Sequence, residues 1–177
     1  MIRTGIFGGS FNPIHNGHIA LARQLKEREG LDEVWLMVSP QNPLKQSASL
    51  LPEEARLEMA RKALEGVEGI IASDYEMHLP RPSYTWNTLQ ALSRDYPERE
   101  FVLMIGGDNW QLFDRWYRAD DIKARYPIVV YTRTPGDEGF IDISSTEVRQ
   151  RVRDGRSIRS LVPPAVADII SEKGYYV

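Results

Sequence analysis

The sequence of 177 residues predicts a doubly wound α/β fold, in which helices cover both faces of a parallel sheet. Two observations lead to this fold class. Short continuous apolar runs of strand length alternate with helical segments, and strands that are apolar throughout are buried on both faces. Two of these runs also end in glycine-rich breaks, at 8–10 and 106–108, and such sheets bind ligands at the carboxyl ends of their strands. We therefore expect one sheet and one cleft, followed by a C-terminal helical segment.

The first part of the chain alternates between strand and helix. An apolar run ends at Gly8-Gly9-Ser10, Gly30 stands where a helix C-terminal cap is expected, and Pro52 suits the first turn of a helix. The elements predicted in order are a strand at 2–7, a helix at 17–28, a strand at 34–38, a helix at 52–64, a weaker strand at 70–72, a helix at 88–95 and a strand at 101–105.

The second part continues the alternation and then becomes helical. The elements predicted in order are short helices at 109–113 and 120–126, strands at 128–131 and 140–143, a helix at 145–154 and a last helix after Pro163-Pro164. No internal repeat, low-complexity tract or linker interrupts this order. We therefore expect residues 1–177 to form a single domain.

The composition is that of an ordinary globular protein, with 42% hydrophobic and 27% charged residues. No apolar run approaches the roughly 18 residues that cross a bilayer, and residues 1–8 do not resemble a secretory signal. We therefore expect a cytoplasmic protein without membrane contact. The absence of cysteine excludes thiolate chemistry, and a net charge of −3 argues against broad nucleic-acid binding.

Gly8 and Gly9 end the first predicted strand without side chains, so backbone N–H groups there can approach an anion closely. A tight turn would use the same glycines. Neither the dinucleotide fingerprint GxGxxG nor the Walker pattern GxxxxGK[ST] is present. Other side chains must therefore bind phosphate.

His15 and His18, two of the three histidines in the chain, follow this strand end with the spacing HxGH. Around the start of a helix this spacing can place both imidazoles on one side, where each can donate a hydrogen bond to a phosphate oxygen. A two-histidine metal site is the alternative, but the sequence offers no cysteine and no well-spaced third ligand. His78 has no such neighbours and is interpreted as structural.

The segment Gly8 to His18, GGSFNPIHNGH, resembles the HxGH motif of the nucleotidyltransferase superfamily. Other segments are similar, in order and essentially from end to end, to bacterial nicotinate-nucleotide adenylyltransferases. They are 40–45 (PQNPLK), 81–85 (RPSYT), 106–108 (GGD), 116–117 (WY), 143–149 (ISSTEVR), 161–164 (LVPP) and 174–176 (GYY). The resemblance implies a Rossmann-like sheet and a single nucleotidyltransferase domain over 1–177.

The resemblance also implies an ATP site. His15 and His18 would bind ATP phosphates and stabilise the transition state, with Lys45 close to the reacting phosphates. The ATP-binding residues implied are Gly8, Gly9, Ser10, Phe11, His15, His18, Gly106, Asp108, Ile143, Ser144, Ser145 and Arg149.

Two of these positions also have a structural interpretation. Ser144 and Glu147 fit a capping box, and a capped helix N-terminus is itself a phosphate site. Asp108 suits either a helix cap or, as the resemblance implies, hydrogen bonds to a ribose. The arginines at 151, 153, 156 and 159 are interpreted mainly as a solvated face.

The second substrate would be selected by Trp116 and Tyr117. An indole offers a flat face for a pyridine ring, and the resemblance implies that Trp116 stacks on nicotinate while the backbone N–H groups of Thr85 and Tyr117 receive its carboxylate. Lys45 would also contact the substrate. Asn12 stands where the superfamily more often has aspartate, and we interpret it as a turn former.

The leading hypothesis is an adenylyltransferase that joins ATP and nicotinate mononucleotide to form deamido-NAD and pyrophosphate. Mg²⁺ would be bound with ATP rather than in a dedicated protein site. The alternatives are a sister enzyme acting on nicotinamide mononucleotide or phosphopantetheine, a catalytically silent nucleotide-binding module, and an NAD-dependent dehydrogenase, which the missing GxGxxG opposes. The sequence sets neither the oligomeric state, nor the degree of preference for the acid over the amide, nor any closure of residues 41–51 over substrate.

Overall fold

The computed structural model describes residues 1–40, 49–132 and 142–177. The strands are β1 (Ile2–Gly9), β2 (Glu33–Val38), β3 (Ile70–Ser73), β4 (Arg99–Gly106) and β5 (Ile128–Tyr131). The α-helices are α1 (Asn16–Arg28), α2 (Glu53–Leu64), α3 (Thr85–Asp95), α4 (Gly107–Gln111), α5 (Ala119–Arg125), α6 (Ser145–Arg153) and α7 (Pro164–Lys173). Two short 3₁₀ helices are η1 (Tyr75–His78) and η2 (Phe113–Arg115).

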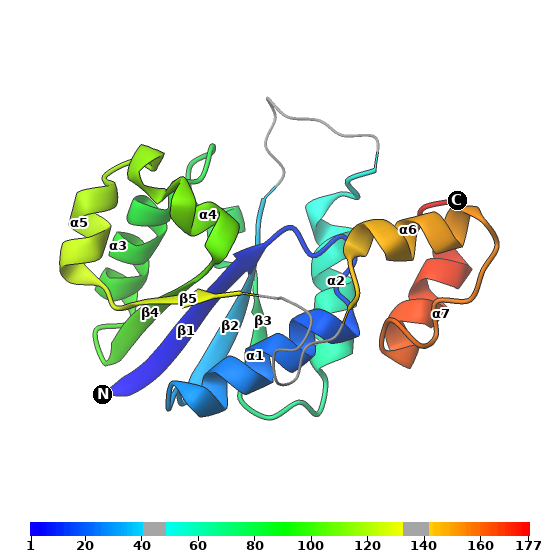
Figure 1. Ribbon diagram of the computed structural model, residues 1–177, viewed down its shortest axis with the longest axis horizontal. Coiled ribbons are helices and arrows are strands. Elements are labelled where there is room, and N and C mark those ends of the chain that lie inside the picture. The colour runs from blue at the N-terminus through cyan, green and yellow to red at the C-terminus, as the bar shows by residue number, and fades with distance from the viewer. Residues whose placement is uncertain (41–48, 133–141) are drawn as a thin grey trace.

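The strands form one parallel sheet in the order β3-β2-β1-β4-β5 (Figure 1). The chain moves outward from β1 through β2 to β3 and then returns to place β4 on the other side of β1. The strand order therefore reverses between β1 and β4, which is where doubly wound sheets bind ligands. The predicted fold class is confirmed.

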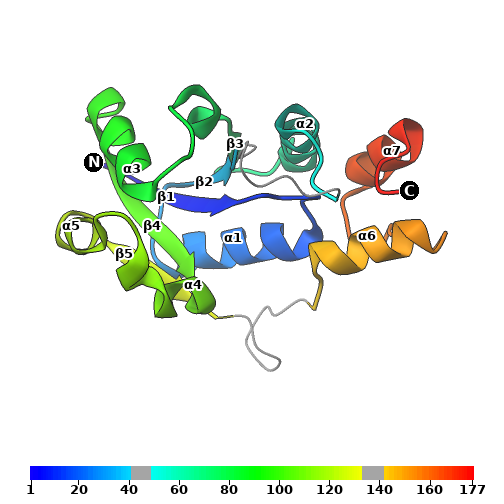
Figure 2. The same cartoon turned by 90° about the horizontal axis from the view of Figure 1, so that it is seen from above.

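Successive side chains along each strand enter two different hydrophobic clusters, because neighbouring residues of a strand point to opposite faces. Val34, Leu36 and Val38 join the cluster formed with α1, α2, α6 and α7, whereas Trp35 and Met37 join the one formed with α3 and α5. Figure 2 shows the helices on the two sides of the sheet. The continuous apolar runs of the sequence therefore reflect burial on both faces.

Most predicted elements are present, with ends that differ by a few residues. α3 begins at Thr85, three residues before the predicted start, and its N-cap Tyr84 makes no side-chain capping bond that the sequence could reveal. The predicted helix at 109–113 is split into α4 and η2. Gly30, with φ +61°, follows the end of α1 in the left-handed conformation expected there.

The sequence predicts a strand at 140–143, but the described part of this range, residues 142 and 143, forms none. Residues 140 and 141 lie outside the described residues, and Asp142 and Ile143 are in no strand. Ile143 is instead buried in the cluster with α1 and α2, directly before the N-cap of α6. Its apolar character reflects this packing rather than sheet pairing. None of the helices in the described part of the chain is long and apolar enough to cross a membrane.

Candidate active site

A cavity of about 250 Å³ lies where β1 and β4 end side by side. Its lining includes Gly8 and Gly9 from β1 and Gly106 from β4, so the two glycine-rich breaks face one cleft, as the sequence predicts. A Cβ atom added at Gly8 would meet nothing within 4 Å. The lack of a side chain there keeps the strand end open, because larger residues would project into this space.

His15 and His18 begin α1 beside this strand end, and their rings stack with centroids 3.6 Å apart. The Nδ1 of His15 accepts the N–H groups of Gly17 (3.0 Å) and His18 (3.3 Å), and the Nδ1 of His18 accepts the N–H of His15 (3.0 Å). A ring nitrogen that accepts an N–H carries no proton, so in the neutral rings the proton is on Nε2. Each histidine thus caps the helix with one nitrogen and has a donor in the other.

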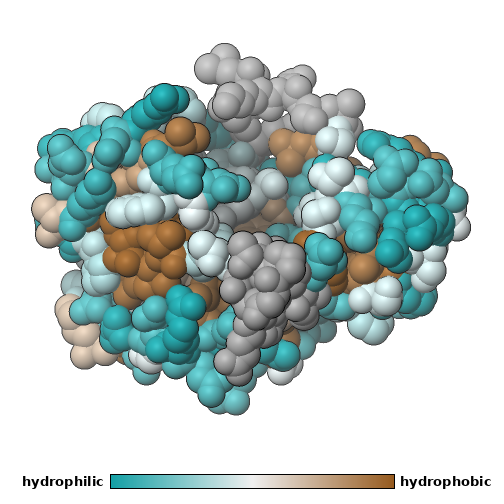
Figure 3. All heavy atoms as spheres, viewed as in Figure 1, coloured by the Kyte–Doolittle hydropathy of each residue, from teal (hydrophilic) through white to brown (hydrophobic). Residues whose placement is uncertain are grey.

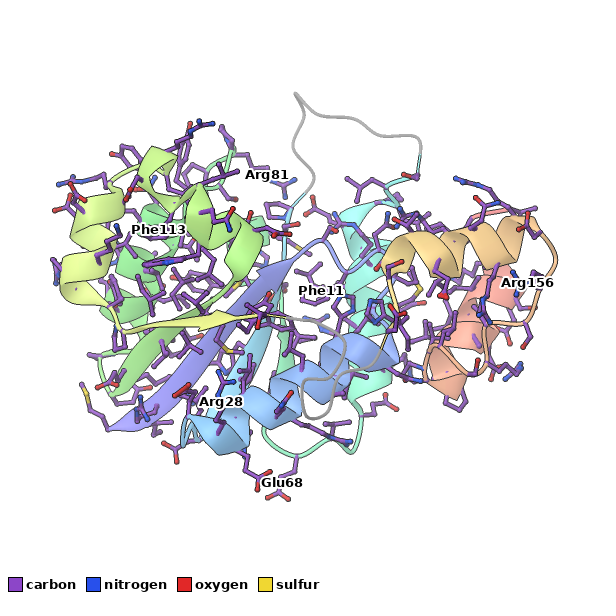
Figure 4. All side chains as sticks on the ribbon, in the orientation of Figure 1. Phe11, Arg28, Glu68, Arg81, Phe113 and Arg156 are labelled. Carbon is purple, nitrogen blue, oxygen red and sulfur yellow. The ribbon has the colours of Figure 1, made fainter. Side chains whose placement is uncertain are left out.

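Aromatic packing fixes the His18 ring from the sheet side. The rings of Phe11 and His18 make a T-shaped contact with centroids 4.9 Å apart, and Phe7 packs against Phe11 with centroids 5.6 Å apart. Phe11 is 3% exposed and has a φ of +47°, a left-handed conformation that is rare without glycine. Figure 4 labels Phe11 where β1, α1 and α6 come together. Its buried side chain therefore supports the histidine pair.

Two side chains of α6 hold the carbonyl groups of the loop between β1 and α1. Arg149 of α6 donates to the Asn12 carbonyl (2.8 Å), and the hydroxyl of Ser145 donates to the Pro13 carbonyl (2.9 Å). Ser144 caps α6 by accepting the N–H of Glu147 at 3.0 Å. The predicted N-cap is confirmed, and it brings the start of α6 next to the histidine loop.

Arg56 of α2 is fully buried and joins three loops. Its Nε donates to the Leu51 carbonyl (2.9 Å), and its Nη1 donates to the carbonyls of Ser10 (2.8 Å) and Ser39 (2.9 Å). Its Nη2 is buried with no hydrogen-bond partner among the described residues. Burial lowers the pKa of Arg56, and the nearby charge of Glu53 raises it. One guanidinium thus anchors the ends of both β1 and β2.

The other end of the cavity is aromatic. Trp116, which follows η2, lines it together with Thr85, the first residue of α3. Tyr117 is 49% exposed and lies against Tyr84, with ring centroids 5.2 Å apart. Arg118 then has a φ of +55° at the start of α5. The geometry brings Trp116 and Thr85 to one cavity, with the Tyr117 side chain outside its lining.

Comparison with known proteins identifies the family. The family model described as cytidylyltransferase-like matches residues 6–151. A protein from Bacteroides fragilis is 50% identical over 93% of this chain and 89% of its own length, and one from Cytophaga hutchinsonii is 40% identical over 99% and 98%. Both have the name "Probable nicotinate-nucleotide adenylyltransferase". The chain belongs to this adenylyltransferase family.

The solved structures agree on the fold of the family. The nicotinic acid mononucleotide adenylyltransferase of Plasmodium falciparum, solved in complex with NaAD, has a TM-score of 0.77. It is 18% identical, and the match covers 99% of this chain and 98% of that one. At this identity the likeness shows the shared fold alone. The Rossmann-like prediction is thereby confirmed.

The described residues that line this cavity include neither Asp108 nor His78. Lys45 falls in 41–48 and lies outside the described residues. Asp108 is exposed in the first turn of α4, whose N-cap is Gly106, so it is not the cap. His78 is exposed and bonds to Asp74 at 3.2 Å, away from the cavity. The roles of these residues and of the other implied ATP contacts stay predictions.

Some arginines of the basic run beyond Arg149 pair with acidic residues of α6 and α7. Arg151 pairs with Glu147 (3.6 Å), and Arg159 pairs with Asp168 of α7 (2.7 Å). Arg156 is labelled in Figure 4 near the far end of this region from Phe11. Figure 3 shows a mainly hydrophilic surface over α6. These contacts are in line with the interpretation of the run as a solvated face.

Sequence reasoning missed Arg56 and the pair Glu76–Thr88 in this adenylyltransferase. Glu76 and Thr88 both line the cavity, and the Thr88 hydroxyl donates to Glu76 Oε2 at 2.7 Å. Burial raises the pKa of Glu76, while this hydrogen bond lowers it. For Arg56 the sequence contained a signal, because it lies one helical turn from Met59 and Ala60 on the buried face of α2.

The donor set suits phosphate oxygens better than a bare cation. In residues 1–40, 49–132 and 142–177, no three His, Asp or Glu side chains gather as a metal site would require. The described groups near the strand ends are N–H donors, a guanidinium and a capped helix start. Mg²⁺ that enters with a nucleotide fits this arrangement, because its ligands would be phosphate oxygens and water.

Proposed function

We propose that this chain transfers the adenylyl group of ATP to the phosphate of nicotinate mononucleotide. A phosphate oxygen of the mononucleotide attacks the α-phosphorus of ATP and forms the new P–O bond. The bond between the α-phosphorus and the oxygen bridging to the β-phosphorus breaks, and pyrophosphate leaves with that oxygen. The products are deamido-NAD and pyrophosphate. This reaction would serve NAD biosynthesis in the cytoplasm.

The observation that carries the proposal is the paired orientation of His15 and His18. Both Nδ1 atoms accept backbone N–H groups, so both Nε2–H groups can be donors. The acceptor phosphate, with a second pKa of about 6, is largely ionised at neutral pH, and no base is needed to activate it. The histidines would then stabilise the charge that develops on the leaving pyrophosphate.

Rigid placement supports this role. The His15 ring accepts two backbone N–H groups, the His18 ring accepts one, and the two rings stack on each other, so little reorganisation is needed when charge develops. The N-terminus of α6, beside the same loop, offers further N–H groups to phosphate oxygens. Arg149 lies one turn inside that helix and would add a positive charge. Lys45 stays part of the proposal as a contact to the reacting phosphates.

The cavity supports selection of a pyridine nucleotide. Its volume of about 250 Å³ lies below the roughly 300–1,000 Å³ of pockets for drug-sized ligands, which suits one ring rather than a dinucleotide. We propose that Trp116 stacks on this ring and that backbone N–H groups of Thr85 and Tyr117 receive its carboxylate. Mg²⁺ bound to the triphosphate would neutralise part of its charge. Gly106 and Asp108 would contact the adenosine.

A pyrophosphate-release assay tests the proposal. The protein is incubated with Mg²⁺ and ATP and, separately, with nicotinate mononucleotide, nicotinamide mononucleotide or phosphopantetheine. We expect release with nicotinate mononucleotide to exceed that with either other acceptor. Faster release with another acceptor would assign the chain to a sister activity, and no release with any would favour a silent nucleotide-binding module.

A further inference from the structure

The side chain of Asn12, three residues before His15, is buried, with 5% of the residue exposed. Both its amide oxygen and its amide nitrogen make hydrogen bonds. Its Oδ1 accepts the hydroxyl of Tyr176 (2.6 Å) and the N–H of Leu51 (3.3 Å), and its Nδ2 donates to the Ser49 carbonyl (2.8 Å). An aspartate has no donor for that carbonyl. This explains the amide at position 12 and makes it more than a turn former.

The bond from Tyr176 spans 164 residues of sequence. Tyr176 follows α7 and is 8% exposed, and its hydroxyl reaches into the loop whose carbonyls are held by Arg149 and Ser145. Hydrogen bonds therefore hold the segment between β1 and α1 at two places. Side chains of α6 bind its main-chain carbonyls, and Tyr176, after α7, binds the Asn12 side chain. These contacts lie immediately before the two histidines.

Backbone strain marks both sides of this contact. Among the described residues, three that are not glycine have left-handed φ values: Phe11 (+47°), Arg118 (+55°) and Tyr176 (+66°). Phe11 immediately precedes Asn12, and Tyr176 is its bonded partner. Residues other than glycine keep this conformation only where surrounding contacts outweigh its cost. Strain at Tyr176 and at Phe11, the neighbour of its partner Asn12, indicates that surrounding contacts fix the position of the hydroxyl.

The Tyr176 hydroxyl remains a donor at neutral pH. Burial raises its pKa, and the nearby positive charges of Arg149 and Arg56 act in the opposite direction. The net direction is upward, so the phenol stays protonated well above neutrality. The contact with Asn12 therefore persists across the pH range in which the acceptor phosphate is ionised.

We propose that Tyr176 is a positioning residue for the ATP side of the reaction, acting through Asn12 to hold the segment that presents His15 and His18. The proposal rests on the proposed adenylyltransferase function. Tyr176 does not touch the reacting atoms: it keeps the loop carbonyls and the first turn of α1 in one arrangement. The acceptor cavity is lined by residues of other segments, Thr85 and Trp116 among them, and does not include Tyr176.

The first test compares Tyr176→Phe with Tyr175→Phe. Each variant removes one hydroxyl, and the hydroxyl of the half-buried Tyr175 makes no hydrogen bond within the described residues. A buried hydrogen bond corresponds to about a 3- to 10-fold effect. We expect kcat/KM for ATP to fall about 3- to 10-fold in Tyr176→Phe, with KM for nicotinate mononucleotide within twofold of wild type. Tyr175→Phe should match wild type in both constants.

Amide hydrogen exchange tests the same idea without turnover. Tyr176→Phe should exchange faster in 10–20 and 49–56, whereas α3 (85–95), which packs on the other face of the sheet, should stay as in wild type. Faster exchange everywhere with unchanged kinetics would reveal a merely structural role and overturn the proposal. Exchange equal to that of Tyr175→Phe would overturn it as well.

A double-mutant cycle identifies Asn12 as the intermediary. Asn12→Leu has a similar shape but no hydrogen-bonding group, so adding Tyr176→Phe to it should lower kcat/KM for ATP by less than twofold further. An undiminished effect of Tyr176→Phe in that background would contradict the route through Asn12. If the wild-type chain releases no pyrophosphate with any acceptor, the proposed function fails, while the exchange result still decides whether Tyr176 orders the loop.

Discussion

Substitution of His18 separates its capping of α1 from its proposed role, because one ring nitrogen caps the helix and the other is the proposed donor to phosphate. His18→Ala removes the acceptor for the His15 N–H, one of the bonds in the capping box. Loss of a cap costs about 1 kcal/mol of folding stability, which lowers Tm by about 2–4 °C in a domain of this size. Domains with about 5–15 kcal/mol of stability remain folded after such a loss. Misfolding therefore cannot account for a large fall in turnover.

The catalytic loss should be much larger. Removal of one preorganised donor to a developing charge lowers kcat by about 10²–10³. Glutamine at this helix position can still accept the N-cap N–H, as in an ordinary capping box. His18→Gln should therefore recover most of the lost Tm but not the turnover. Circular dichroism melts give Tm, and pyrophosphate release at saturating substrates gives kcat. A kcat within threefold of wild type in either variant would refute the role of the imidazole.

Two further substitutions test the acceptor cavity and the buried arginine. Trp116→Ala should raise KM for nicotinate mononucleotide about 5- to 150-fold, since stacking of a ring on an aromatic side chain contributes about 1–3 kcal/mol. Trp116→Phe should recover part of this loss, and an equal rise in KM for ATP would refute stacking. Arg56→Met should lower the free energy of unfolding by about 3–5 kcal/mol in a denaturant titration, because it leaves the carbonyls of Ser10, Ser39 and Leu51 without their donor. A loss below about 1 kcal/mol would show that water replaces the guanidinium.

Local patterns predicted most of the fold because its strands are buried on both faces and its helices are short and regularly spaced. β2 is an example: the run at 34–38 contains only apolar residues, and all five are buried. The error at 140–143 has the same origin. Apolar residues there suggested a strand, but Ile143 is buried by packing against helices, and no local pattern distinguishes the two kinds of burial.

The site was predictable where chemistry follows from spacing and hidden where it depends on distant contacts. The HxGH spacing placed His15 and His18 together, yet their tautomer follows from which backbone N–H groups each Nδ1 accepts. The helical spacing of Arg56 with Met59 and Ala60 indicated a buried position, but its role depends on carbonyl groups at the ends of two strands, which no local pattern reveals. Tyr176 and Asn12 are too far apart in sequence for any local pattern to connect them.

The division of the interior by the sheet would separate the two proposed recognition tasks, binding of the acceptor and binding of the triphosphate. The floor of the acceptor cavity includes Ile6, Leu103 and Ile105, which belong to the cluster with α3 and α5. Phe11, which supports the histidine pair, belongs to the cluster with α1 and α2. Under the proposed function, mutations in one cluster would alter the choice of acceptor and leave the contacts to the triphosphate on the opposite face unchanged.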